Sequence, residues 1–90
     1  MDVTPDQLSQ RILALARARG PNKTICPSEV ARDLAGSNEK AWRLLMRPIR
    51  AQAVKLARAG AIELRRKGKP VNVDDFKGIY RIAWTEKETP

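Results

Sequence analysis

The pattern of apolar and polar positions predicts two helices in the first 36 residues. Residues 4–7 combine a capping threonine, a proline and a capping-box glutamine, and apolar residues then recur at helical spacing. We therefore expect a first helix over about residues 5–19. A short β-prone run at 24–26 separates it from a second helix of about nine residues, which begins at Pro27 and stops at Gly36.

The third helical region carries a continuous apolar face that a proline interrupts. Start signals lie at residues 37–39, and the apolar face extends over residues 42–56. A proline inside a helix removes a hydrogen bond and clashes with the preceding turn. Pro48 therefore predicts a kink, or two helices of about 39–46 and 48–59.

Two stretches in the C-terminal third alternate at the period of a β-strand. They cover residues 61–65 and 79–84, and a loop of about 13 residues joins them. The order of helix, short strand, helix, helix, strand, loop and strand is that of a winged helix-turn-helix. The predicted fold is therefore mainly α with a small antiparallel β-wing. We expect a single domain over residues 1–90, ordered over about 4–84.

The positive charge is concentrated in the central third of the chain. The net charge is +8, and residues 40–69 hold ten basic side chains against one carboxylate, Glu63, which is a net of +9. Residues 1–39 have a net charge of zero, and residues 70–90 a net charge of −1. Such clustering is typical of a nucleic-acid-binding protein. A generically basic surface is the alternative interpretation.

Cations recur at helical spacing on one side of the third helical region, away from its apolar face. In helix-turn-helix proteins, side chains of the recognition helix reach base edges in the major groove, where arginine pairs with guanine and glutamine with adenine. A solvated helix face is the alternative. The residues expected to contact nucleic acid here are Arg43, Arg47, Arg50, Gln52, Lys55 and Arg58.

A second cationic group follows the first of the two predicted strands. Arg66, Lys67 and Lys69 lie beside Gly68 in a loop that can approach phosphates or a minor groove. The alternative is a solubilising turn whose lysines protect an edge strand. Helix and wing together predict a nucleic-acid-binding module, with double-stranded DNA as the favoured ligand. The alternative function is a protein-interaction module that meets an acidic partner or forms a homodimer through the first helix.

Side chains that carry out catalysis are scarce. The chain has no histidine and one cysteine, so the sequence predicts no enzyme activity, metal site or cofactor. Cys26 lies in an apolar setting and is expected to be a buried structural thiol. Asp74 and Asp75 are expected to be turn residues rather than metal ligands. The two tryptophans are assigned to the core and its edge rather than to base stacking.

The cellular location follows from composition. A lone cysteine cannot form an internal disulfide, as expected in a reducing compartment. The chain has no apolar run of about 18 residues and begins without the features of a secretory signal. We therefore expect a cytoplasmic protein without a membrane contact.

Several segments also carry a family resemblance, which covers about residues 7–84. They are Ile25-Cys26-Pro27-Ser28-Glu29-Val30-Ala31-Arg32, Trp42-Arg43-Leu44-Leu45-Met46, Ile49-Arg50, Leu56-Ala57-Arg58-Ala59-Gly60-Ala61-Ile62 and Gly68-Lys69-Pro70-Val71. On these residues the chain resembles a small bacterial family of winged-helix-like domains of unknown function. The resemblance implies the fold and no activity. The additional turn around Trp42 departs from a compact helix-turn-helix.

Overall fold

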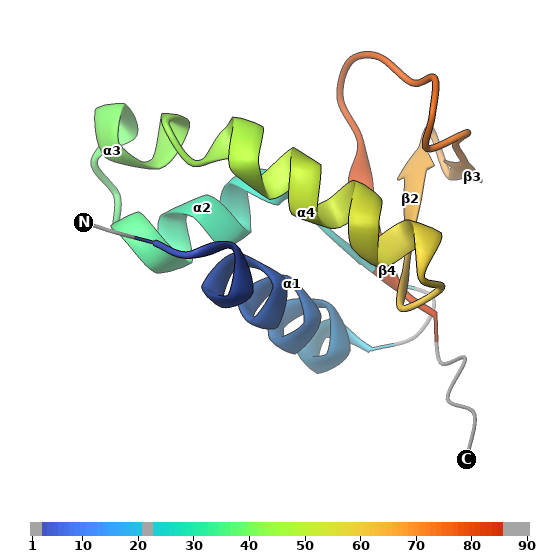
Figure 1. The fold of residues 1–90 in the computed structure, drawn as a ribbon, viewed down its shortest axis with the longest axis horizontal. Coiled ribbons are helices and arrows are strands. Elements are labelled where there is room, and N and C mark those ends of the chain that lie inside the picture. The colour runs from blue at the N-terminus through green and yellow to red at the C-terminus, as the bar shows by residue number, and fades with distance from the viewer. Residues whose placement is uncertain (1–2, 21–22, 86–90) are drawn as a thin grey trace.

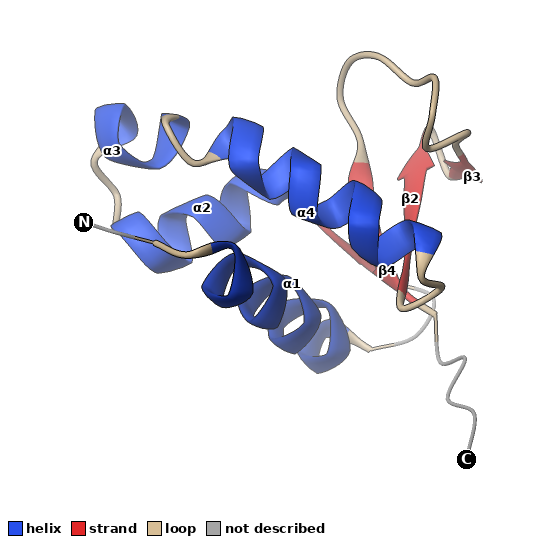
Figure 2. Cartoon of the chain, viewed as in Figure 1, coloured by secondary structure: helices blue, strands red, loops and turns tan. Residues whose placement is uncertain are grey.

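The computed structural model describes residues 3–20 and 23–85, and within them the chain forms four helices and four short strands. The strands make one antiparallel sheet in the order β1-β4-β2-β3. Figure 2 shows the helices as a bundle with the strands along one side of it. This arrangement is compatible with a winged-helix-like fold. The elements are α1 (Pro5–Arg19), β1 (Thr24–Ile25), α2 (Pro27–Ala35), α3 (Glu39–Arg43), α4 (Met46–Arg58), β2 (Ile62–Arg66), β3 (Lys69–Pro70) and β4 (Arg81–Trp84) (Figure 1).

The first helix begins and ends where the sequence predicts. Thr4 is its N-cap, and the Thr4 hydroxyl oxygen accepts a hydrogen bond from the N–H of Gln7 at 3.1 Å. The Gln7 side chain in turn accepts from the N–H of Thr4 at 2.9 Å, which completes a capping box. The helix ends before Gly20, whose positive φ of 99° suits a residue without a side chain.

The third helical region divides before Pro48 rather than at it. Helix α3 ends at Arg43 and α4 begins at Met46, so Pro48 lies in the first turn of α4. A first-turn N–H has no acceptor within its own helix, so the proline loses nothing there. Its ring would clash with the carbonyl of Leu44 if the helix were continuous, so helical bonding is interrupted at residues 44–45. Of the two predicted outcomes, a kink or two helices, the structure shows two helices, and the first is shorter than expected.

A tight hairpin replaces the first part of the predicted long loop. Lys67 and Gly68 join β2 to β3 with φ values of 53° and 79°, and a two-residue type I′ turn requires positive φ at both positions. Arg66 then pairs with Lys69 across the turn. The sequence did not indicate β3 because it is two residues long and includes a proline. The chain returns through residues 71–80 to β4, which pairs with the other side of β2.

The core lies between the helices and the inner face of the sheet. Helices α1 and α4 pack on each other, α4 packs on β2, and α1 packs on β4. Among the described residues, no charged side chain is buried. The largest fully buried side chains are Leu8, Ile12, Val30, Ile49, Ile62, Leu64 and Ile82.

Both tryptophans pack against this core from partly exposed positions, as expected. The guanidinium of Arg32 lies 5.7 Å from the ring centroid of Trp42, and that of Arg17 lies 5.9 Å from Trp84. Because Arg17 belongs to α1, Trp84 closes the edge of the core beside that helix. No helix in residues 3–20 and 23–85 is long and apolar enough to cross a membrane.

Cys26 is partly exposed, and the expectation of a buried thiol was wrong. It occupies the N-cap of α2, where its N–H donates to a carboxylate oxygen of Glu29 at 2.7 Å. The Cys26 sulfur lies 3.0 Å from the hydroxyl oxygen of Ser28. An N-cap residue sits at the end of its helix rather than in the packed stripe, which leaves the thiol in contact with solvent.

Candidate nucleic-acid interface

The exposed side of α4 carries a row of cations. Ile49 and Ala53 are fully buried and fix the orientation of the helix. Arg47, Lys55 and Arg58 fall on the opposite side, at positions i, i+8 and i+11, and all three are exposed. The periodicity of the sequence therefore places these three residues on one surface, which we call the α4 row.

Arg50 points away from this row and into the structure. Its guanidinium donates a hydrogen bond to the backbone carbonyl of Phe76 at 2.7 Å and lies 3.9 Å from the centroid of the Phe76 ring. The ring of Tyr80 is 5.9 Å away and meets Phe76 edge-on at 71°. A half-buried cation needs a carbonyl and ring faces in place of water. The structure therefore sets Arg50 apart from the predicted nucleic-acid-contacting row.

Phe76 and Tyr80 belong to the loop of residues 71–80, and two further arginines of the predicted site also bond to this loop. Arg58 at the end of α4 forms an ion pair with Asp74, and both side chains are more than half exposed. Arg66 at the end of β2 donates a hydrogen bond to the backbone carbonyl of Lys77. The loop itself turns at residues 72–75, where the N–H of Asp74 donates to the side chain of Asn72, as expected for turn residues. Arginines from α4 and the hairpin thus brace the loop on both sides.

Gln52 and Arg43, the last two of the predicted helical residues to be placed, also have partners. The amide oxygen of Gln52 accepts a hydrogen bond from the hydroxyl of Ser9 at 3.0 Å, which ties α4 to α1. Arg43 lies in α3 and pairs with Glu39 one turn earlier, at 3.5 Å, with both side chains exposed. An exposed pair of this kind is weak and leaves Arg43 available to another anion.

Four cations of the predicted site have no hydrogen-bond or ion-pair partner among the residues that the structure describes. They lie on α4 and on the β2–β3 hairpin, and all are exposed. An exposed residue that the sequence analysis did not single out, Lys77, lies close to the hairpin because Arg66 binds its carbonyl. Lys77 is an isolated cation in a loop that carries both signs of charge, so no sequence pattern indicated that it lies near the predicted site. The four cations are Arg47, Lys55, Lys67 and Lys69.

Tyr80 lies beneath the braced loop and is 7 % exposed. Burial raises the pKa of Tyr80 to about 12, because the phenolate is poorly solvated there, and Arg50 partly opposes the rise. The Tyr80 hydroxyl has no hydrogen-bond partner among the described residues. The phenol is therefore neutral at physiological pH.

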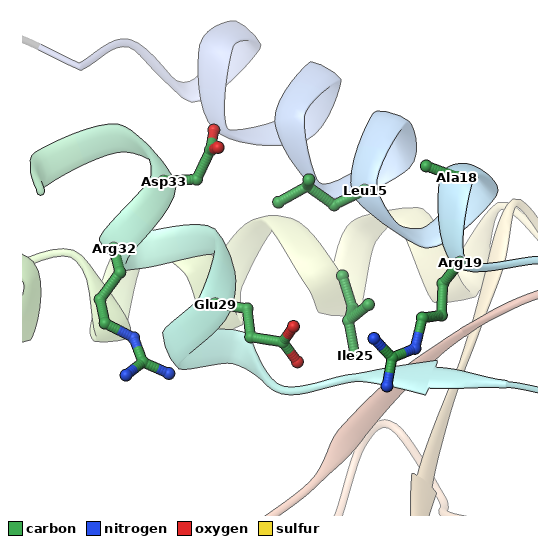
Figure 3. A pocket seen from close by; sticks show the side chains of 7 residues that line it. All are labelled: Leu15, Ala18, Arg19, Ile25, Glu29, Arg32 and Asp33. Carbon is green, nitrogen blue, oxygen red and sulfur yellow. The ribbon is translucent and has the colours of Figure 1, made fainter.

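A separate hollow of about 630 Å³ lies between α1, β1 and α2 (Figure 3). Its carboxylates are used within the fold: Glu29 accepts from the N–H of Cys26, and Asp33 points toward α1 and pairs with Arg11 at 2.9 Å. Charges of both signs meet here, whereas on α4 Arg47 and Lys55 have no ion-pair partner among the described residues. The lining residues are Leu15, Ala18, Arg19, Ile25, Glu29, Arg32 and Asp33.

Comparison with known families identifies the class of domain. The chain belongs to the family described as "Protein of unknown function (DUF3253)", whose sequence model matches residues 5–85. The match spans every helix and strand described above. It agrees with the resemblance to an uncharacterised family seen in the sequence. A search of curated proteins found no match.

Proposed function

We propose that this domain is a nucleic-acid-binding module of the winged-helix type and that its ligand is double-stranded DNA. The observation that carries the proposal is the set of exposed cations on α4 and on the β2–β3 hairpin that have no partner within residues 3–20 and 23–85. In this assignment α4 is the recognition helix and the hairpin is the wing.

The two elements have different roles in the proposal. The major groove of B-DNA admits an α-helix, and an arginine near the start of that helix can bind guanine through two hydrogen bonds. Arg47 is in the first turn of α4 and takes this role, while Lys55 contacts phosphate. Lys67 and Lys69 stand on either side of Gly68 at the tip of the hairpin and contact the phosphate backbone.

The braced loop supports this assignment. Arg50, Arg58 and Arg66 fix residues 71–80 against both α4 and the hairpin. A fixed loop holds the wing at one angle to the helix, so that both can meet the same duplex without an ordering cost at binding.

Alanine variants test the two roles separately. Fluorescence anisotropy with a labelled 20-base-pair duplex should show that K67A/K69A weakens binding equally for all sequences, since phosphate contacts carry no sequence information. R47A should weaken binding to a selected sequence by about tenfold more than to a random one, in line with about 1–3 kcal/mol for a bidentate base contact.

Lys23 provides the matched control, because it is an exposed lysine next to β1, which lies at the opposite edge of the sheet from β3 of the hairpin. The K23A variant should bind duplex as the parent does. Equal losses in K23A and K67A/K69A would mean that only total charge matters, and the proposed interface would be rejected.

One observation favours a second function, the docking of a protein. Leu44 is 78 % exposed at the corner between α3 and α4, beside Arg43, so an acidic partner with an apolar contact fits there. The L44S variant separates the two functions. It leaves duplex affinity unchanged if the corner serves only a protein partner, and it lowers self-association in sedimentation if that partner is a second copy.

A further inference from the structure

Two arginines occupy paired positions on the side of the sheet that the helices leave uncovered. Side chains alternate along a strand, and Leu64 of β2 and Ile82 of β4 point into the core. Their neighbours Arg65 and Arg81 therefore lie on the outer face, where they are directly paired across the two strands. Like charges placed opposite each other destabilise a sheet. An anion close to both groups offsets this repulsion, and within the described residues Glu63 supplies a carboxylate to Arg65 alone.

The protein orients these two guanidinium groups without using all their donors. Arg65 donates through Nε to a carboxylate oxygen of Glu63 at 2.6 Å. Arg81 donates through Nε to the hydroxyl of Thr24 at 2.6 Å and through its terminal nitrogen to the Thr24 carbonyl at 3.3 Å. A guanidinium carries five N–H groups, so each arginine retains donors for a ligand.

A groove of about 470 Å³ lies against this pair, and we call it the sheet groove. Its apolar part is Ile79, which is 82 % exposed although it is a large aliphatic side chain. Among the described residues no carboxylate lines the groove, and its volume lies within the range of small-molecule sites. The lining residues are Arg65, Arg66, Lys67, Gly78, Ile79 and Arg81.

We propose that the sheet groove binds a phosphate ester of about mononucleotide size. The phosphate lies between Arg65 and Arg81, with Lys67 at the hairpin end, and the organic part of the ester packs against Ile79. A phosphate monoester fits better than a carboxylate because it carries close to two negative charges and three acceptor oxygens, which match several cations at once. Duplex binding by α4 is a separate claim, because Arg65, Ile79 and Arg81 are outside the α4 row and the two proposed sites share only Lys67.

The probe is a fluorescent analogue of adenosine monophosphate, titrated with the whole chain and followed by anisotropy. We expect saturable binding, competition by inorganic phosphate at higher concentration, and a loss of at least tenfold in R81Q. I79S should lose several-fold and cannot unfold the protein easily, because the side chain is exposed. Arg81 also holds β1 through Thr24, so a thermal melt of R81Q and the conservative R81K variant accompany the titration.

Two further arms complete the test. K23A and R47A serve as charge controls and should bind the nucleotide as the parent does. Single-stranded oligonucleotides with and without a 5′-phosphate are then tested as competitors of the fluorescent nucleotide. If the natural phosphate is the end of a nucleic acid, only the phosphorylated strand should compete. If it belongs to a free nucleotide, neither strand should compete. The proposal is overturned by absence of saturable binding at millimolar nucleotide, or by equal binding in the parent, I79S and folded R81Q or R81K.

Discussion

The contact between Arg50 and the loop gives the sharpest prediction of stability. In R50A the hydrogen bond to the Phe76 carbonyl at 2.7 Å is lost, and so is the cation at 3.9 Å from the Phe76 ring. A hydrogen bond to a charged group contributes about 1.5–3 kcal/mol and a cation–π contact about 0.5–2 kcal/mol. These contributions sum to about 2–5 kcal/mol. Because Arg50 is only half-buried, we expect the free energy of unfolding to fall by about 2–4 kcal/mol.

Urea denaturation at 25 °C, followed by tryptophan fluorescence, measures this loss. A domain of this size should also melt roughly 10–30 °C lower, at about 4–8 °C per kcal/mol. The matched control is R47A, one turn earlier in α4, where the side chain is exposed and lacks a protein partner among the described residues, so its effect should be within about 0.5 kcal/mol. R50K should recover less than half of the loss, because lysine has neither the planar group nor the fork of donors. If R50A and R47A prove equally stable, the bracing of the loop by Arg50 is refuted.

Three other perturbations test neighbouring parts of the structure. Replacing Asp74 by asparagine removes the carboxylate that pairs with Arg58, so duplex affinity should rise and the slope of log affinity against log salt should steepen by about one. Anisotropy titrations across salt measure both effects, and unchanged titrations would exclude Arg58 from the interface. G68A places a side chain at a φ of 79° and should cost about 1–2 kcal/mol in urea unfolding, and a neutral result would contradict the hairpin geometry. The pKa of Tyr80 is about 12 in the folded state and 10 in the unfolded state, so its neutral form contributes full stability below pH 10 and less as the pH rises toward 12. Urea titrations at pH 9 and pH 11 should show this loss of stability in the parent but not in Y80F.

The sequence was sufficient for the features set by local pattern. The capping box at Thr4 and the spacing of Ile49 and Ala53 determine where α1 begins and which side of α4 is exposed. The α4 row follows directly, because a 3.6-residue period fixes the opposite face once the buried one is known. The split before Pro48 was also predictable, since the physical conflict between a proline ring and the preceding turn is local.

The rest depends on contacts between residues distant in the chain. Arg50 shares the basic character of its neighbours, and only the position of Phe76, 26 residues later, turns it inward. The opposition of Arg65 and Arg81 exists only in one strand register, which no alternation pattern specifies. Strand β3 is too short to produce a periodic signal.

The central claim is that phosphates of a duplex displace counterions from four exposed cations that have no partner in the described part of the chain: Arg47, Lys55, Lys67 and Lys69. Anisotropy titrations of the 20-base-pair duplex between 50 and 200 mM salt measure this directly. The account predicts a logarithmic slope of about −3 to −4, which becomes about −2 in K67A/K69A. A flat slope, or no binding at the lowest salt, would contradict the account.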